Sequence, residues 1–342
     1  MAIFTIIGSI IGAGFASGQE IFLFFYKYGL NGIYGLIVCS LLMFYIIYKV
    51  LKIVYEKNIN TYREFLDFIF NKRYSKRKYL NISYINENIV NIFLLGTFFI
   101  MIAGFGAFFS QEFGINKIIG SCMIALFSYF VFLTNIKGLT KVNSMIVPIL
   151  IICIVLIGTK SIHNTNIFRV ISNKSTNDFL WIINAIVYTS YNIILLIPIL
   201  VNLREYIRNK KNIFFISAIS SMVFFMLAIS IFSILSNLES SFEGIEMPTI
   251  YVVKNKFSNF GALYGLIILI SIFTTATSVG ISFLGNICNK KENYINIAKI
   301  MCISSLVFSK MGFSNLVKIL FPAFGLLGMF QLWKIIKVKN NF

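Results

Sequence analysis

The sequence predicts an all-α polytopic membrane protein with ten transmembrane helices. Hydrophobic residues make up 58% of the 342 positions and charged residues only 12%, whereas soluble domains average about 45–50% and about 25%. A water-soluble fold of this size has too little interior for the surplus of Phe, Ile and Leu. The apolar stretches are also continuous and about 20 residues long, as a membrane-spanning helix requires. They lack the two-residue alternation of β-barrel strands.

Charge and cysteine content exclude several other classes of function. The formal net charge is +18, but the cations lie in short clusters between apolar stretches, which indicates membrane topology and not nucleic-acid binding. The five cysteines form no CxxC pair, and His163 is the only histidine. We therefore expect no disulfide framework, no zinc site, no histidine-based catalysis and no resident cofactor.

Ten apolar segments separated by polar turns form the predicted spans. They cover residues 2–26, 32–54, 88–111, 116–135, 143–161, 179–202, 213–236, 259–286, 294–309 and 313–336. The ninth span is the shortest of them. We treat residues 1–342 as one membrane domain, with a first repeat of five helices at about 1–162 and a second at about 176–338.

The distribution of Lys and Arg predicts the orientation of the chain in the membrane. In this topology the connections on one side carry 21 of the 30 basic residues and those on the other side carry 9. The side richer in Lys and Arg faces the cytoplasm. Both termini are therefore expected on the cytoplasmic side of a cell membrane.

Residues 57–82 form the longest cytoplasmic connection. Tyr62, Phe65, Phe68 and Ile69 lie at helical spacing in it, and a basic cluster follows. We expect a short helix in the membrane interface, with its cations near anionic headgroups. The alternative is a solvated basic segment that serves only as a topology signal.

The first span contains four glycines in eleven positions, namely Gly8, Gly12, Gly14 and Gly18. Each weakens a helix by nearly 1 kcal/mol relative to alanine. A broken helix is tolerated at membrane depth only where protein or a watery cavity surrounds it. A packing face is the alternative, but Gly12 and Gly14 point about 200° apart around a helix and cannot share one stripe. We therefore predict an interruption of this helix.

The sixth span has a polar cluster from Tyr188 to Asn192, followed by Pro198. An unpaired Asn in lipid costs a few kcal/mol, although hydrogen bonds between helices are an alternative role for it. This span opens the second group of five helices as the first span opens the first group. Interrupted segments at matching places in two inverted halves mark the binding site of a transporter. The cluster therefore predicts a second interrupted helix that faces the first.

The run from Gly8 to Glu20, GSIIGAGFASGQE, resembles the first-helix motif of the amino acid–polyamine–organocation (APC) superfamily. Within it, the chain is most similar to the YkvI-type bacterial membrane proteins. The likeness extends over most of the chain, through the YTSYN stretch of span six, the Met247-Pro248-Thr249 loop and the ten-span layout. It implies the LeuT fold, a 5+5 inverted repeat that binds substrate where helices 1 and 6 are interrupted. It implies little about the substrate itself.

The resemblance also implies a substrate site. Backbone N–H groups of Gly12, Ala13 and Gly14 would hold an anionic group of the substrate, which agrees with the partial positive charge of a half-helix N-terminus. The residues expected to face it from span six are Tyr188, Ser190, Tyr191 and Asn192. Many superfamily members have an acidic or aromatic residue near this last position. The neutral amide here leaves a cationic substrate group without an obvious partner.

Five hydroxyl side chains lie in the otherwise apolar eighth span, namely Ser271, Thr274, Thr275, Thr277 and Ser278. One interpretation is that these hydroxyls have no ligand and bond to carbonyls of their own helix. The functional alternative is a sodium site, because hard cations prefer oxygen ligands. The resemblance implies carbonyl ligands near Gly8 and Ile11, with hydroxyls from either Thr274 and Thr275 or Thr277 and Ser278. Proton-coupled relatives can have a lysine in the middle of helix five. The absence of one from residues 143–159 favours sodium.

Glu20 is the rival candidate for coupling, as a proton carrier. An ionisable residue inside a span is a functional candidate by default. In a continuous helix it would lie about 12 Å beyond Gly12, near the outer vestibule. The alternative is an interfacial carboxylate without a role in transport. Gln111 and Glu112, at the outer end of span three, are expected to be interfacial.

Together these patterns predict a secondary transporter that moves an amino acid or similar small zwitterion by alternating access and is coupled to sodium. Its expected partners are a small-molecule substrate and the lipid bilayer, and the sequence indicates no oligomeric state. Proton coupling through Glu20 is one alternative, and a non-transporting ligand sensor, like germinant-receptor subunits, is another. An enzyme is not expected, because the sequence has no HExxH motif and no nucleophile with a usable histidine.

Overall fold

The computed structural model describes residues 2–70, 80–134, 139–164, 179–207, 209–238, 245–288 and 291–338. Within these residues, six helices are long and apolar enough to cross a membrane. They are α4 (Leu30–Glu56), α6 (Leu80–Phe113), α10 (Leu180–Asn202), α11 (Lys210–Leu235), α13 (Ser258–Ile287) and α15 (Phe313–Lys337). Each coincides with a predicted span.

Three further helices contain shorter apolar stretches and also coincide with predicted spans. They are α7 (Lys117–Thr134), α8 (Leu139–Asn164) and α14 (Lys291–Ser309). The first predicted span consists of three short helices, α1 (Ala2–Ile10), α2 (Ala13–Ala16) and α3 (Gln19–Phe24). A polytopic all-helical membrane protein is therefore confirmed. The count of ten transmembrane helices and the division into two repeats stay predictions.

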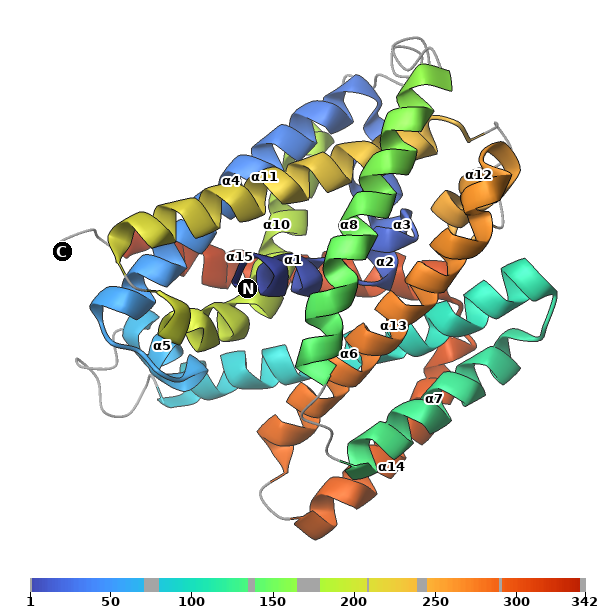
Figure 1. Ribbon diagram of the computed structural model, residues 1–342. Coiled ribbons are helices and arrows are strands. Elements are labelled where there is room, and N and C mark those ends of the chain that lie inside the picture. The colour runs from blue at the N-terminus through green and yellow to red at the C-terminus, as the bar shows by residue number, and fades with distance from the viewer. Residues whose placement is uncertain are drawn as a thin grey trace.

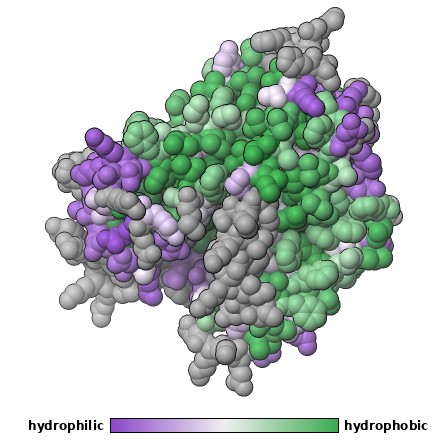
Figure 2. All heavy atoms as spheres, in the orientation of Figure 1, coloured by the Kyte–Doolittle hydropathy of each residue, from purple (hydrophilic) through white to green (hydrophobic). Residues whose placement is uncertain are grey.

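Large apolar side chains cover the outside of the bundle. Figure 2 shows a broad hydrophobic zone across the molecule, with hydrophilic side chains gathered at its two ends. On α7, for example, the apolar residues Leu126, Phe127 and Phe130 are exposed. A soluble protein would bury such residues, so this surface fits contact with lipid hydrocarbon.

The short helices of the first segment run through the middle of the bundle (Figure 1). α1 packs against α8, α10 and α11, whereas α3 packs against α10, α11 and α15. α2 lies against α6 and α13. Irregular backbone at membrane depth needs protein around it, and this central position supplies it. The predicted interruption of the first helix is confirmed.

The sixth span differs from the prediction. α10 is a single α-helix from Leu180 to Asn202 with Pro198 inside it, so the expected interruption at residues 188–192 is wrong. The reason lies in the polar side chains themselves. Thr189 donates to the carbonyl of Ala185 at 2.8 Å, and Ser190 donates to that of Ile186 at 2.7 Å. Each polar group is thus satisfied within an intact helix.

Close helix packing also keeps α10 regular. Gly325 and Gly328 of α15 lie directly over the backbone of Val187 and Ser190, where the Cβ of a larger residue would be too close to the Val187 and Ser190 carbonyl groups. α4 covers another face of α10. Small residues that allow such an approach are typical of helix contacts in membranes.

The connection after α4 contains the expected short helix, α5 (Tyr62–Ile69). Thr61 accepts a hydrogen bond from the Glu64 amide at 3.2 Å, and Glu64 accepts one from the Asn60 amide at 2.9 Å. This reciprocal capping begins the helix. The Asn60 N–H also holds the pKa of Glu64 below its usual range. Residues 71–79, with the basic cluster, lie outside the described residues.

The apolar face of α5 is not solvated. Phe65 and Ile69 are buried, and α5 packs against α6 and α10. Among the described residues, three further short helices join the others: η1 (Tyr26–Tyr28) follows α3, η3 (Leu203–Tyr206) follows α10, and α12 (Pro248–Lys256) precedes α13. α12 packs against the first segment near the end of α2, as described below.

Candidate substrate and coupling site

The first interruption lies at Ile11 and Gly12, between α1 and α2. Gly12 has extended backbone, with φ −96° and ψ −173°, and so ends the α1 hydrogen-bond ladder. The Ile11 carbonyl accepts a hydrogen bond from Ser271 Oγ of α13 at 3.3 Å. A neighbouring helix thus satisfies a backbone group that the break exposes.

A second interruption lies at Ser17 and Gly18, which the sequence did not predict as a separate break. Gly18 has a left-handed backbone, with φ +77°, which glycine adopts without strain. The Ala16 carbonyl accepts hydrogen bonds from Thr249 Oγ1 at 2.8 Å and from Tyr264 Oη at 2.7 Å. The Thr249 amide donates to the Ser17 carbonyl at 3.1 Å. The start of α12 therefore packs against the C-terminal end of α2.

Glu20 follows this second break and points into the protein. Only 3% of the residue is exposed. Its Oε2 accepts a hydrogen bond from Tyr188 Oη at 3.2 Å and another from Tyr191 Oη. Glu20 is thus buried within the protein, and its role in coupling stays a prediction. The distance of about 12 Å from Gly12 assumed a continuous helix, but the chain is not helical between Ser17 and Gly18.

The Glu20 side chain folds back onto Gly14 of α2. A Cβ built on Gly14 would lie 2.9 Å from both Cγ and Cδ of Glu20, closer than a side chain tolerates. Glycine at position 14 therefore leaves the space that the Glu20 side chain fills. This places a carboxyl group beside the residues predicted to hold an anionic group of the substrate.

Aromatic rings surround the two tyrosines that contact Glu20. Tyr191 stacks on Phe321 of α15, with ring centroids 4.8 Å apart, and Tyr188 meets Phe24 of α3 edge-on at 5.2 Å. Phe93 of α6 lies 6.3 Å from Tyr191. All five side chains are buried. The carboxyl group of Glu20 thus lies in a largely aromatic environment built from four helices.

The predicted substrate residues lie near one another but differ in their contacts. Tyr188 and Tyr191 face Glu20, as described. Ser190 bonds within α10, and Asn192 Nδ2 donates to the Tyr188 carbonyl of the same helix at 3.0 Å. The other three, Gly12, Ala13 and Gly14, are buried at the break and the start of α2. Their role in substrate binding stays a prediction.

The predicted sodium ligands form a looser group. Thr274 Oγ1 donates to the Ile270 carbonyl at 2.9 Å, and Thr277 Oγ1 donates to the Phe273 carbonyl at 2.8 Å. Thr275 lies next to the break, since its Cγ2 would be 3.7 Å from a Cβ on Gly12. Gly8 packs against Val147 of α8. Sodium binding stays a prediction.

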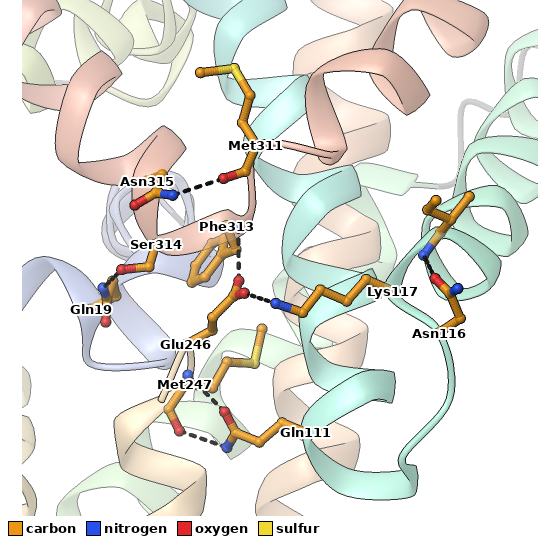
Figure 3. A network of polar contacts seen from close by, with 11 residues as sticks. Gln19, Gln111, Asn116, Lys117, Glu246, Met247, Met311, Phe313, Ser314 and Asn315 are labelled. Carbon is orange, nitrogen blue, oxygen red and sulfur yellow. Dashed lines mark hydrogen bonds and ion pairs between the residues drawn. The ribbon is translucent and has the colours of Figure 1, made fainter. Parts of the chain in front are cut away.

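A network of polar contacts lies where α6 ends and α7 and α15 begin (Figure 3). Glu246 pairs with Lys117 at the start of α7 and accepts a hydrogen bond from the Phe313 amide at 2.8 Å. Gln111 of α6 holds both backbone groups of Met247, at 3.0 and 3.1 Å. We call these five residues the outer clamp, after the side of the membrane on which the distribution of Lys and Arg predicts them to lie. The expected interfacial position of Gln111 stays a prediction.

The outer clamp extends to the first segment. Gln19, beside Glu20 in α3, donates to Ser314 Oγ of α15 (Figure 3). Glu112, at the end of α6, pairs with Lys254 of α12 at 3.1 Å. The sequence did not indicate the roles of Thr249, Tyr264 or Glu246. The only local signal was Thr249, a polar residue beside Pro248, because the partners named above for these three residues all lie more than sixty residues away.

Two curated proteins of Bacillus subtilis (strain 168) match nearly the whole chain. The uncharacterized membrane protein YkvI is 27% identical over 336 residues, covering 94% of this chain and 90% of YkvI. The uncharacterized protein YyaD is 24% identical over 347 residues, covering 96% of this chain and 93% of YyaD. The chain is a homologue of YkvI and YyaD. The resemblance to YkvI-type proteins is thus confirmed, although no family model matches.

Two solved transporter structures share the fold. A variant of the Eremococcus coleocola manganese transporter superposes with a TM-score of 0.63 at 13% identity, covering 98% of this chain and 77% of that one. A Na+-coupled sialic acid symporter, in a substrate-bound outward-open state, superposes with a TM-score of 0.61 at 16% identity, covering 99% and 78%. These neighbours are LeuT-fold-like transporters and not enzymes. Identities this low establish the fold alone.

Proposed function

We propose that this protein is a secondary active transporter that moves an amino acid or related small zwitterionic solute by alternating access. The observation that carries the proposal is the position of Glu20, buried between a twice-interrupted first helix and the tyrosines of α10. Interrupted helices at the centre of such bundles supply binding groups for solutes. The fold shared with two transporters supports transport as the general activity.

We do not propose that this protein transports the solutes of these two structural neighbours. Manganese is not proposed, because no three His, Cys, Asp or Glu side chains gather into a metal site among the described residues. An amino group on the solute is favoured by the carboxyl group of Glu20 and the rings around it, since aromatic faces and carboxylates both attract cations.

We further propose that Glu20 couples transport to a proton gradient. A buried ionisable group inside a membrane bundle is the usual place for a coupling proton. Glu20 has two phenol partners and no cation, since the ion pairs among the described residues join Lys117 with Glu246, Lys210 with Glu56, and Lys254 with Glu112.

Uptake by proteoliposomes tests this function. Vesicles with purified protein receive a panel of radiolabelled amino acids under a pH gradient, a sodium gradient, or neither. We expect uptake that follows the pH gradient and is lost in Glu20→Gln. Glu56→Gln makes the same chemical change at the far end of α4 and should retain uptake. Solute-dependent thermal stabilisation without uptake would instead favour the non-transporting sensor.

Sodium coupling is the second candidate, and one contact favours it. The Ile11 carbonyl at the first break accepts a hydrogen bond from Ser271 Oγ of α13, and the methyl group of Thr275 lies beside Gly12. This contact supports the Thr274–Thr275 pair over the Thr277–Ser278 pair as oxygen ligands. Sodium should then raise the thermal stability more than potassium does, and Thr275→Val should remove the difference. Equal stabilisation by both ions would exclude this candidate.

A further inference from the structure

We propose that Glu20 binds either a proton or the ammonium group of the solute, never both, so that the protein exchanges solute for a proton. This inference rests on the proposed transport function and specifies the direction of coupling. It makes the solute an amine that enters as a proton leaves by the same site.

The first step of the argument concerns charge. A carboxylate buried without a cation costs several kcal/mol, and two neutral phenol donors compensate only part of it. Glu20 is buried, and none of the ion pairs among the described residues includes it. The group therefore needs a positive partner, which is either a proton or a cation brought by the solute.

The second step concerns space at the carboxyl group. Oε2 already accepts hydrogen bonds from Tyr188 and Tyr191, whereas Oε1 accepts none of the hydrogen bonds that the described residues make and lies toward Gly14. Only one oxygen is thus available for a further partner. A proton and an ammonium group compete for that oxygen.

The third step concerns the kind of cation. Buried rings from α3, α6, α10 and α15 surround the tyrosines that hold Glu20, among them Phe24, Phe93 and Phe321. Aromatic faces attract organic ammonium groups, including quaternary ones, by their π electrons. An inorganic ion would prefer several oxygen ligands, which this aromatic environment does not supply.

The neighbouring titratable groups do not provide an alternative partner. Tyr188 and Tyr191 face Glu20 from α10, and Cys39 of α4 accepts a hydrogen bond from Thr189 behind them. Tyr26 of η1 (Tyr26–Tyr28) packs against Phe232 of α11. The nearest cation on α15 by sequence, Lys318, is exposed, as are Lys210 and Lys211 at the start of α11. Among the described groups named here, Glu20 is thus the only carboxyl group.

The direction of the pH change inside the vesicles distinguishes exchange from symport. Proteoliposomes contain a pH-sensitive dye, start at equal pH inside and outside, and have their membrane voltage clamped with potassium and valinomycin. Choline, ethanolamine or alanine is added outside, and radiolabelled flux is followed in parallel. Exchange predicts that the lumen becomes alkaline as solute enters, whereas symport predicts that it becomes acidic. Choline carries a permanent charge and cannot cross as a free base, so it excludes passive amine leakage.

Three variants accompany the wild type. Glu20→Gln should lose the proton movement, Glu20→Asp should retain it with weaker apparent affinity for the solute, and the matched control Glu56→Gln should behave as the wild type. Gel filtration and thermal unfolding establish that each variant is folded. If Glu20→Gln does not fold, exchange is still tested by Glu20→Asp, which should retain it, and by the direction of the pH change that the wild type produces.

The outcomes distinguish a failure of the exchange mechanism from a failure of the proposed transport function. Alkalinisation with one proton per labelled solute supports exchange. Acidification, solute flux without any pH change, or proton movement that persists in Glu20→Gln overturns exchange and leaves the transport function standing. If no amino acid of the uptake panel and none of these three probes moves, transport of such solutes fails as well.

Discussion

The side chain of Glu20 fills the space beside Gly14, and a Cβ added to Gly14 would lie 2.9 Å from Cδ of Glu20. The two residues are six positions apart, on either side of the break at Gly18. Their contact brings a carboxyl group to the place where a half-helix would otherwise hold an anion. The glycine-rich run thus permits a carboxyl group of the protein to reach its own interrupted helix.

Gly14→Ala should displace Glu20 and impair transport. Overpacking of a filled interior costs about 1–3 kcal/mol. A loss of about 1.4 kcal/mol in binding free energy raises a dissociation constant tenfold. We therefore expect the apparent affinity for the solute to fall roughly tenfold. Initial rates of uptake at several solute concentrations measure it. The matched control is Gly285→Ala in α13, where no atom lies within 4 Å of the new Cβ. Equal effects of both changes would contradict a specific role for Gly14.

Tyr191→Phe should weaken the hold on Glu20 while the ring still stacks on Phe321. One hydrogen bond contributes about 0.5–1.5 kcal/mol, so apparent affinity should fall by a few-fold without loss of folding. Solute-dependent thermal shifts measure this change. Tyr251→Phe alters a partly exposed phenol of α12 and serves as the control. An unchanged affinity in Tyr191→Phe would argue against the phenol contact.

Thr249→Val should destabilise the fold through the second break. It removes the hydroxyl that bonds to the Ala16 carbonyl, and an acceptor deprived of its donor in a buried site costs about 1–3 kcal/mol. The midpoint of thermal unfolding in detergent should fall. Thr159→Val removes an exposed hydroxyl that bonds only within α8 and should leave the midpoint nearly unchanged. Similar midpoints for both variants would contradict the role of α12 in closing the break.

Glu246→Gln should loosen the outer clamp. The change removes the charge that pairs with Lys117, and it weakens the acceptor that the Phe313 amide uses. We expect faster hydrogen exchange at the start of α15 and around residues 245–250, since opening of this side exposes those amides. Glu112→Gln breaks a neighbouring ion pair that involves no backbone amide and should change exchange less. Unaltered exchange in Glu246→Gln would show that the clamp does not hold the outer side closed.

Local chemistry was enough to predict much of the fold. Apolar stretches of bilayer length predicted nine of the helices described here to within several residues, because every long helix in lipid must carry such a stretch. The break at Ile11 and Gly12 was also predictable, since the low helix propensity of glycine acts within a few residues. The polar cluster in α10 misled for a related reason. Its hydroxyls bond to their own helix, and a sequence does not distinguish that arrangement from a break.

The sequence by itself determined the class of protein, its helices and the first interruption, because hydrophobic length and glycine content act over short stretches of chain. Only the tertiary structure decided where Glu20 points. The left-handed turn at Gly18 redirects the chain, and that turn depends on Thr249 and Tyr264, which lie more than 200 residues further along. Contacts between segments so distant leave no local pattern, so the carboxyl group at the centre of the site became visible only in the folded chain.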